Sequence, residues 1–282
     1  MEEVIISTAQ RSLVAGTPLL LGTIGEVICE RSGILNLGVE GMMAIGAVTA
    51  FIVTYVSGNP WLGLLAAIAA GMLVSSAHAF AAITLQANQV VSGLALTMLG
   101  LGLSGLLGKP YIGRPLTVKF ESVAVPVLSD IPYLGRVFFD QIKIKSTGES
   151  PQATEAQGVN VSAIRYWCVV TGGGLAGMAG ANLSISYSKS WIEGMTAGRG
   201  WIVIALTIFA LWNPMRAVIG AFLFGGIFVL QYLLQPLGIS PNLLAALPYA
   251  ATLVVLLMIG LGDSRKLNAP AMLAEPYKRG ER

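Results

Sequence analysis

Eight apolar stretches, each close to the length that a bilayer demands, constrain this chain more than any other feature. A membrane-spanning helix needs about 20 predominantly apolar residues. The windows lie at 10–28, 35–57, 61–85, 89–108, 163–187, 200–213, 215–235 and 243–262. Only 11% of the residues are charged, whereas soluble domains carry about 25%. We therefore expect an all-α, polytopic transmembrane helical bundle that forms a single domain over residues 1–282.

A polar stretch at 148–160 interrupts the apolar pattern and predicts a short helix. Ser150 precedes Pro151, and Gly158 follows seven residues after Pro151, which suits an N-cap, a first helical position and a left-handed stop. Two interpretations stay open. The stretch is either a solvated loop between two spans or a helix that docks on a soluble partner.

Basic residues predict which loops face the cytoplasm. They lie at 142–165, at Arg216 and in the tail over 263–282, and short cytoplasmic loops are rich in Lys and Arg. Alternation from the tail backwards places all three on one side. It also places the mixed segment 109–141 on that side, because no apolar window separates it from 142. The net charge of +3 is too small to indicate a nucleic-acid partner.

Ionisable and amide side chains at membrane depth indicate a polar interior. Charge in lipid costs about 2.5–3.5 kcal/mol, so we expect these groups to face the bundle: Glu26, Glu30, Arg31, Asn36, Glu40, Asn88 and Gln89. The glycine-rich run 100–105 predicts a loose or broken helix, and broken helices at this depth tend to line a pathway. Small residues at four-residue spacing, such as Gly173, Gly177 and Ala181, predict close helix packing.

Enzymatic interpretations find weaker support. Ser104 lies in a Gly-Leu-Ser-Gly run that resembles the serine motif of rhomboid intramembrane proteases, but His78 precedes it rather than following it. We expect His78 to be a hydrogen-bonded contact between helices, and one histidine predicts no metal site. No phosphate-binding loop is present, so the chain would bind no ATP itself. An intramembrane serine protease and a passive channel or facilitator are the alternatives that remain.

Three stretches carry a resemblance that covers nearly the whole chain. They are 25–43, beginning Gly-Glu-Val-Ile-Cys-Glu-Arg-Ser-Gly; 149–181; and 190–201, Ser-Trp-Ile-Glu-Gly-Met-Thr-Ala-Gly-Arg-Gly-Trp. They resemble bacterial ABC importer permeases of the simple-sugar and nucleoside type, relatives of the ribose and branched-chain amino-acid permeases. Such permeases have one more span before the coupling region. The resemblance therefore implies that about 20–30 residues are absent near 141/142, and restoring them would place 109–141 outside the cell.

The resemblance also implies a mechanism and its partners. The chain would be a multi-pass subunit in the bacterial inner membrane that imports nucleosides or simple sugars by alternating access. Its partners would be an ATPase that binds ATP and Mg, a second homologous permease and an extracytoplasmic binding lipoprotein. The cytoplasmic coupling region, 142–162, would contact the ATPase through Thr154, Glu155, Ala156, Gln157, Gly158 and Asn160. Candidate pathway residues are Glu26, Asn36, Glu40, Asn88 and Ser92; candidate docking residues for the binding protein are Trp191, Glu193 and Arg199.

Overall fold

The computed structural model describes residues 2–118, 142–261 and 269–277, and within these ranges the regular structure is entirely helical. Six helical stretches are long and apolar enough to cross a membrane. They are α1 (Glu2–Arg31), α2 (Val39–Ser57), α3 with η1 (Pro60–Ala79, Phe80–Thr84), α4 with η2 (Gln89–Gly108, Lys109–Tyr111), α8 with η3 (Val161–Ala181, Asn182–Tyr187) and α10 (Pro214–Leu233). This arrangement confirms an all-α polytopic bundle.

The two remaining apolar windows fall on shorter helices. Helix α9 (Arg199–Phe209) has 11 residues and α12 (Leu247–Gly260) has 14. Short elements complete the description: η4 (Gln235–Leu237), α11 (Pro241–Ala245), α6 (Ile142–Glu149) and α7 (Pro151–Ala156). The eight windows thus correspond to six long helical stretches and two short ones.

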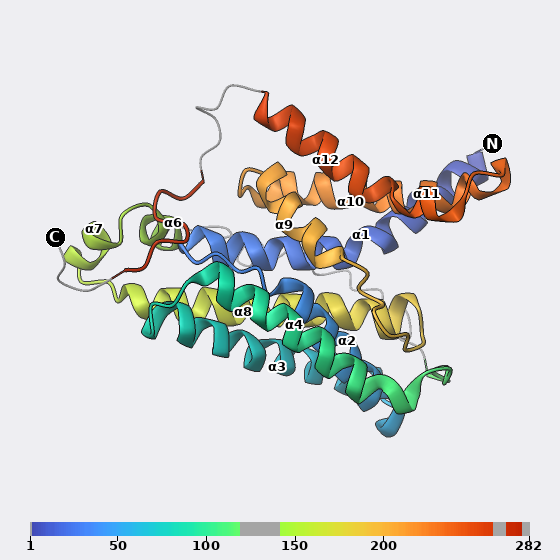
Figure 1. Ribbon diagram of the computed structural model, residues 1–282, viewed down its shortest axis with the longest axis horizontal. Coiled ribbons are helices and arrows are strands. Elements are labelled where there is room, and N and C mark those ends of the chain that lie inside the picture. Colours follow the sequence, from blue (N-terminus) through green and yellow to red (C-terminus); the bar gives the residue numbers. More distant parts are fainter. Residues whose placement is uncertain (1, 119–141, 262–268, 278–282) are drawn as a thin grey trace.

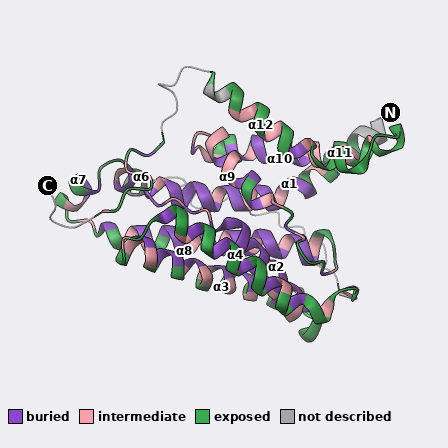
Figure 2. Cartoon of the chain, in the orientation of Figure 1, coloured by how far each residue is buried: buried purple, intermediate pink, exposed green. Residues whose placement is uncertain are grey.

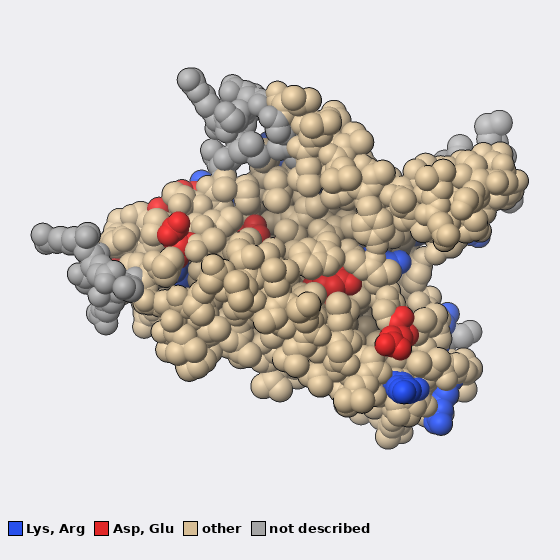
Figure 3. Space-filling view, in the orientation of Figure 1, with Lys and Arg blue, Asp and Glu red and all other residues tan. Residues whose placement is uncertain are grey.

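Helices α1, α2 and α8 form the centre of the bundle (Figure 2). Within their apolar windows, 72% of the residues of α2 and α8 and 61% of those of α1 are buried, against 28% for α3 and α4. Figure 3 shows that most of the visible surface lacks charged side chains. The outer helices therefore present the apolar surface that suits lipid.

Small residues bring the outer helices α3 and α10 close to the central helices, as their spacing predicts. Gly177 of α8 lies against the backbone of Ala67 and Gly71 of α3, and Gly225 of α10 lies against Gly16 of α1. A side chain at either glycine would collide with backbone atoms of the neighbouring helix. These contacts confirm the prediction of close helix packing.

The predicted break at 100–105 is wrong, because α4 runs unbroken from Gln89 to Gly108. Gly100 lies directly against Gly41 of α2, whereas no heavy atom lies within 4 Å of the Cβ position of Gly102. The run therefore includes a contact glycine at the α2–α4 crossing and does not form a loose segment.

The bundle has two distinct ends (Figure 1). Helices α6 and α7 and residues 269–277 lie at one end, where Arg31, Lys145, Trp212 and Pro270 share one groove. At the other end, Leu116 donates its N–H to the carbonyl of Lys189 at 3.0 Å. Residues 109–118 and 142–149 thus lie at opposite ends of the bundle. The rest of the predicted 109–141 segment, residues 119–141, lies outside the described residues.

Candidate functional site

The connection between α1 and α2, residues 32–38, turns back into the bundle. Asn36 Nδ2 donates to Glu26 Oε2 at 3.2 Å, and Glu26 lies five residues before the end of α1, a rise of about 7 Å. Ser32, Gly33 and Ile34 are buried as well. Non-helical backbone at membrane depth is tolerated where protein surrounds it or where it lines a cavity. We call 32–38 the re-entrant segment; it is the interruption that the sequence analysis sought at 100–105.

Side chains from α3 and α4 satisfy the backbone at the middle of the re-entrant segment. Leu35 donates its N–H to Gln89 Oε1 at 2.8 Å, and its carbonyl lies 3.1 Å from His78 Nε2. Because a carbonyl only accepts, His78 Nε2 is the donor, and in the neutral ring Nδ1 then accepts from the Ser92 hydroxyl at 3.0 Å. His78 is therefore a hydrogen-bonded helix contact, as predicted, and Ser92 orients its ring.

The two ends of the segment are held in the same way. Arg165 Nε of α8 donates to the carbonyl of Ser32 at 3.1 Å. Thr97 Oγ1 of α4 donates to the carbonyl of Leu37 at 2.8 Å. The segment is thus attached to α3, α4 and α8 through its backbone.

Two buried carboxylates lie one helical turn apart on α1, beside the re-entrant segment. Glu30 Oε2 accepts from the indole Nε1 of Trp212 at 2.5 Å, and Glu26 is paired with Asn36. Their side chains are 2% and 1% exposed. These groups face the interior, as the cost of charge in lipid predicts.

Glu40 connects α2 to the start of α9. Its two carboxylate oxygens accept from the N–H groups of Gly198 at 2.8 Å and Gly200 at 2.5 Å. A carboxylate at a helix N-terminus satisfies donors that have no intrahelical partner and opposes the positive end of the helix dipole. Since Gly198 offers no side chain for a cap, Glu40 takes over that role from a neighbouring helix.

Asn88 is the candidate pathway residue that does not join this group. It is exposed at the start of α4, where its side chain accepts from the N–H of Val91 at 3.0 Å. The other four candidates, Glu26, Asn36, Glu40 and Ser92, lie inside the bundle on or near the re-entrant segment.

The sequence analysis missed Arg165 and Thr97, although glycines at both ends of 32–38 were a signal for a chain interruption.

The predicted coupling helix is present as α7. Ser150 occupies the N-cap position, Pro151 is the first helical residue and Gly158 has a φ of +79°. The Ser150 side chain makes no capping bond. The backbone carbonyl of Ser150 accepts from the Thr154 hydroxyl at 2.9 Å instead. Thr154 is buried, whereas Ala156, Gln157, Gly158 and Asn160 are exposed. The exposed residues are the ones available to a partner.

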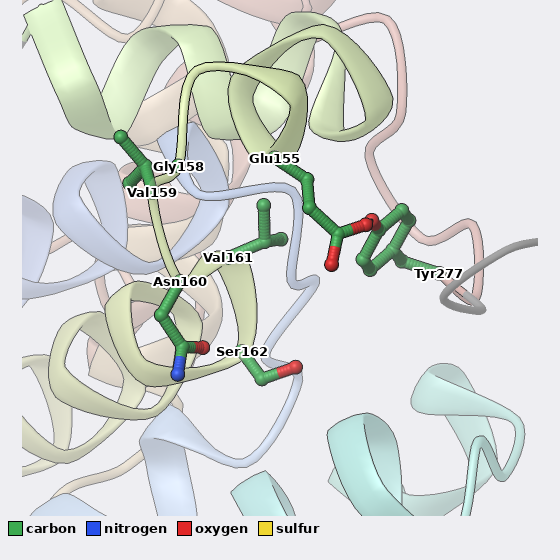
Figure 4. A pocket seen from close by; sticks show the side chains of 7 residues that line it. All are labelled: Glu155, Gly158, Val159, Asn160, Val161, Ser162 and Tyr277. Atoms are coloured by element: carbon green, nitrogen blue, oxygen red, sulfur yellow. The ribbon is translucent and has the colours of Figure 1, made fainter.

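A polar groove of about 190 Å³ lies beside α7 (Figure 4). It is formed by the turn from α7 into α8 and by Tyr277 from the end of the described chain. The Tyr277 hydroxyl donates to the Glu155 carboxylate. Sequence reasoning did not single out Tyr277, because nothing local indicates that the tail returns to α7.

The candidate docking residues differ in their accessibility. Trp191 is 1% exposed and lies against Gly108, so its indole supports the fold and offers no surface to a partner. Glu193 is exposed. Arg199 donates to the carbonyl of Met195 at 3.0 Å, and its guanidinium lies 4.9 Å from the ring centre of Phe228.

A serine–histidine pair suited to proteolysis is not formed by Ser104. Its hydroxyl donates to the carbonyl of Leu101 at 2.9 Å, while both ring nitrogens of His78 are engaged by Ser92 and Leu35. Nothing in this geometry activates Ser104 as a nucleophile.

The fold and site define a polytopic membrane protein with a polar interior and a short helix exposed at one end. The chain belongs to the family described as the permease component of the branched-chain amino acid transport system, which matches residues 8–136 and 142–261. It is therefore a transport subunit rather than an enzyme. A permease of this family is one subunit of an ABC transporter, which implies an ATPase partner.

Three relatives match over much or most of their length. A Haloferax volcanii protein, provisionally named a glucose ABC transporter permease, is 38% identical over 94% of this chain and 95% of its own. The guanosine ABC transporter permease protein NupQ of Bacillus subtilis is 34% identical over 96% of both chains. The nucleoside ABC transporter permease protein NupC of Lactococcus lactis is 33% identical over 76% of this chain and 78% of its own. No solved structure matches the chain significantly.

Proposed function

We propose that this permease moves nucleosides or simple sugars into the cell, driven by a partner ATPase. The observation that carries the substrate class is the similarity, over most of the chain, to proteins named for guanosine, nucleosides and glucose. These solutes are neutral and rich in hydroxyl groups. A route for them needs hydrogen-bonding groups and no fixed counter-charge, and the carboxylates Glu26, Glu30 and Glu40 each have a donor partner within the fold.

The route we propose passes the re-entrant segment. Glu26, Asn36, Glu40 and Ser92 lie around it, and Asn88 lies exposed at the start of α4, where it could contact solute at the cytoplasmic mouth. Broken helices at membrane depth are a recurrent way to build a transport site. Alternating access would then come from rocking of the helices to which the segment is attached.

The ATPase contact we propose is α7 and the turn that follows it. Ala156, Gln157, Gly158 and Asn160 offer an exposed face, Glu155 lines the groove beside it, and Thr154 holds the helix from within. Closure of the ATPase around this helix would move it as a lever. ATP and Mg would be bound by the ATPase, not by this chain.

The remaining partners follow from the arrangement of the two ends. We place the α7 end in the cytoplasm and the 109–118 end outside the membrane, which for a bacterial protein is the inner membrane. Exposed Glu193 and half-buried Arg199 would contact an extracytoplasmic binding lipoprotein. A second homologous permease would complete the pathway.

We also propose that one family span is absent near 141/142. The family match divides at this point, and the alignment with the Haloferax relative runs over 314 residues although this chain has 282. Either the printed sequence omits a segment of the protein or the protein is a deleted variant. An intact mass near 29.5 kDa would rule out the omitted segment and leave the deletion, for which we expect weak transport.

The experiment that tests the substrate class is uptake by cells with and without this gene. Labelled guanosine, cytidine and glucose would be compared with ribose and leucine. We expect loss of nucleoside or glucose uptake and unchanged leucine uptake in cells without the gene. Loss of leucine uptake alone would move the substrate to amino acids and contradict the proposal.

A further inference from the structure

Residues 269–277, with a turn over 271–274, form a strap across the end of the bundle that holds α6 and α7 (Figure 1). Met272 donates its N–H to the carbonyl of Gly148 at 2.9 Å, and Ala271 donates to the Glu149 carboxylate at 3.4 Å. The strap is therefore attached to the last turn of α6, directly before α7.

The same strap is bonded to the re-entrant segment. Ala274 donates its N–H to the carbonyl of Gly33 at 3.2 Å. Gly33 has a φ of +92°, and a Cβ there would lie 3.2 Å from the carbonyl oxygen of Met272 and 2.8 Å from Arg165. The glycine thus permits strap and segment to approach closely, so the two are in direct contact.

The end of the strap is held by Tyr277. Its hydroxyl donates to Glu155 of α7, its carbonyl accepts from Gln86 Nε2 at 3.2 Å, and its ring centre lies 5.7 Å from the Arg165 guanidinium. Arg165 also donates to Ser32 of the re-entrant segment. Tyr277 therefore contacts α7 directly and the re-entrant segment through one intervening side chain.

Helix α7 needs such a support if it is to transmit force. It has six residues, and helices this short are marginal in water without tertiary contacts. Apart from the strap, its main helix contacts in the described structure are with its chain neighbours α6 and α8. The strap adds a direct connection from α7 into the bundle, beside the indirect one through α6, which contacts α1 and α8.

We propose that the strap 269–277 is a second coupling element, which joins α7 to the re-entrant segment so that the two move together. This proposal rests on the proposed function, because it assigns the route by which the ATPase acts on the pathway. Glu155–Tyr277 is the contact at the α7 end, and Ala274–Gly33 is the contact at the pathway end.

The test measures ATP hydrolysed per solute transported, with the complete complex of permeases, ATPase and binding protein in vesicles. Tyr277→Phe removes the hydroxyl that bonds Glu155. We expect the ratio of ATP to solute to rise several-fold while the ATPase still co-purifies. Tyr166→Phe is the matched control, since it removes a phenol bond to Thr84 that lies outside the strap, and its ratio should equal that of the unaltered complex.

A double-substitution cycle separates the strap contact from a general loss of folding. If Tyr277 acts through Glu155, the double variant Tyr277→Phe, Glu155→Ala should be no worse than the more impaired single variant, since alanine removes the acceptor that glutamine would keep. The strap proposal is overturned if the unaltered complex transports and either of two results is found. The first is an unchanged ratio of ATP to solute for Tyr277→Phe, and the second is additive losses in the double-substitution cycle. An unaltered complex without ATP-driven transport would overturn the proposed function instead.

Discussion

Glu40 holds the start of α9 through its backbone. It accepts from two backbone N–H groups at the start of that helix and is 3% exposed. Replacing Glu40 by Ala leaves buried donors unpaired, which costs about 1–3 kcal/mol each. We expect a clearly lower melting temperature in detergent and reduced uptake. The exposed Glu193→Ala variant should melt like the unaltered protein; equal melting of both variants would show that the cap carries no stability.

Gly158 permits the chain to leave α7 in a left-handed conformation. Its φ is +79° and no heavy atom lies within 4 Å of its Cβ position, so a substitution there meets backbone strain and no collision. That strain amounts to about 1–2 kcal/mol for an L-residue. We expect Gly158→Val to reduce uptake strongly without reducing the amount of protein in the membrane.

Gly58 offers the matched control for this substitution. It ends α2 with a φ of +67° and is equally open, but it lies far from α7. Gly58→Val should therefore lose comparable stability and retain ATP-driven uptake. If both variants lost uptake to the same degree, strain alone would explain the effect and α7 would have no special role.

At the scale of single residues, the sequence predicts structure well at positions where few residue types suit the backbone or the membrane. Pro151 and Gly158 indicate the limits of α7 because proline suits the first turn and glycine suits the left-handed exit. Burial of Glu26 and Glu40 follows from the cost of exposing charge to lipid. Their partners, Asn36 and the backbone of Gly198 and Gly200, could not be predicted, since they depend on how distant segments meet.

Helix α4 provides a test of helix packing within one element. A Cβ at Gly100 would collide with the backbone of Gly41, whereas the position two residues later, Gly102, is open. We expect Gly100→Ala to destabilise the bundle, and Gly102→Ala to be neutral or to add stability of about 1 kcal/mol, because alanine favours the helix over glycine. Melting temperatures of the two variants decide, and equal values would contradict the α2–α4 contact.

The re-entrant segment shows where element prediction fails. The glycine-rich run at 100–105 suggested a broken helix, yet the interruption lies at 32–38. Glycine in a membrane helix serves close packing as readily as it permits irregular backbone, so glycine density alone cannot distinguish the two. What stabilises the irregular backbone is His78, Gln89 and Arg165, which lie far away in the sequence.

The whole molecule has two ends that we assign to opposite sides of the membrane. Thr117, next to Leu116 at the 109–118 end, and Ala153 of α7 are exposed, and both native cysteines, Cys29 and Cys168, are buried. A membrane-impermeant maleimide should label Thr117→Cys in intact cells and label Ala153→Cys only after permeabilisation. Labelling of both variants from outside would contradict the assignment.

The number of crossings illustrates what composition can and cannot determine in the whole chain. Apolar length predicted eight windows, and all eight correspond to helices, but only six of them are long enough to cross a membrane. The arrangement of those helices around α1, α2 and α8 was not predictable, since it depends on which small residues meet.

The central claim is that this chain is the permease of an ATP-driven transporter. The most direct measurement is uptake of labelled guanosine, with glucose in parallel, into vesicles that contain the complete complex with its ATPase facing the interior. The vesicles are loaded with ATP in one sample and left without ATP in the other. We expect accumulation above the external concentration with ATP and none without it. Equilibration at the same rate in both conditions would identify a passive channel and contradict the claim.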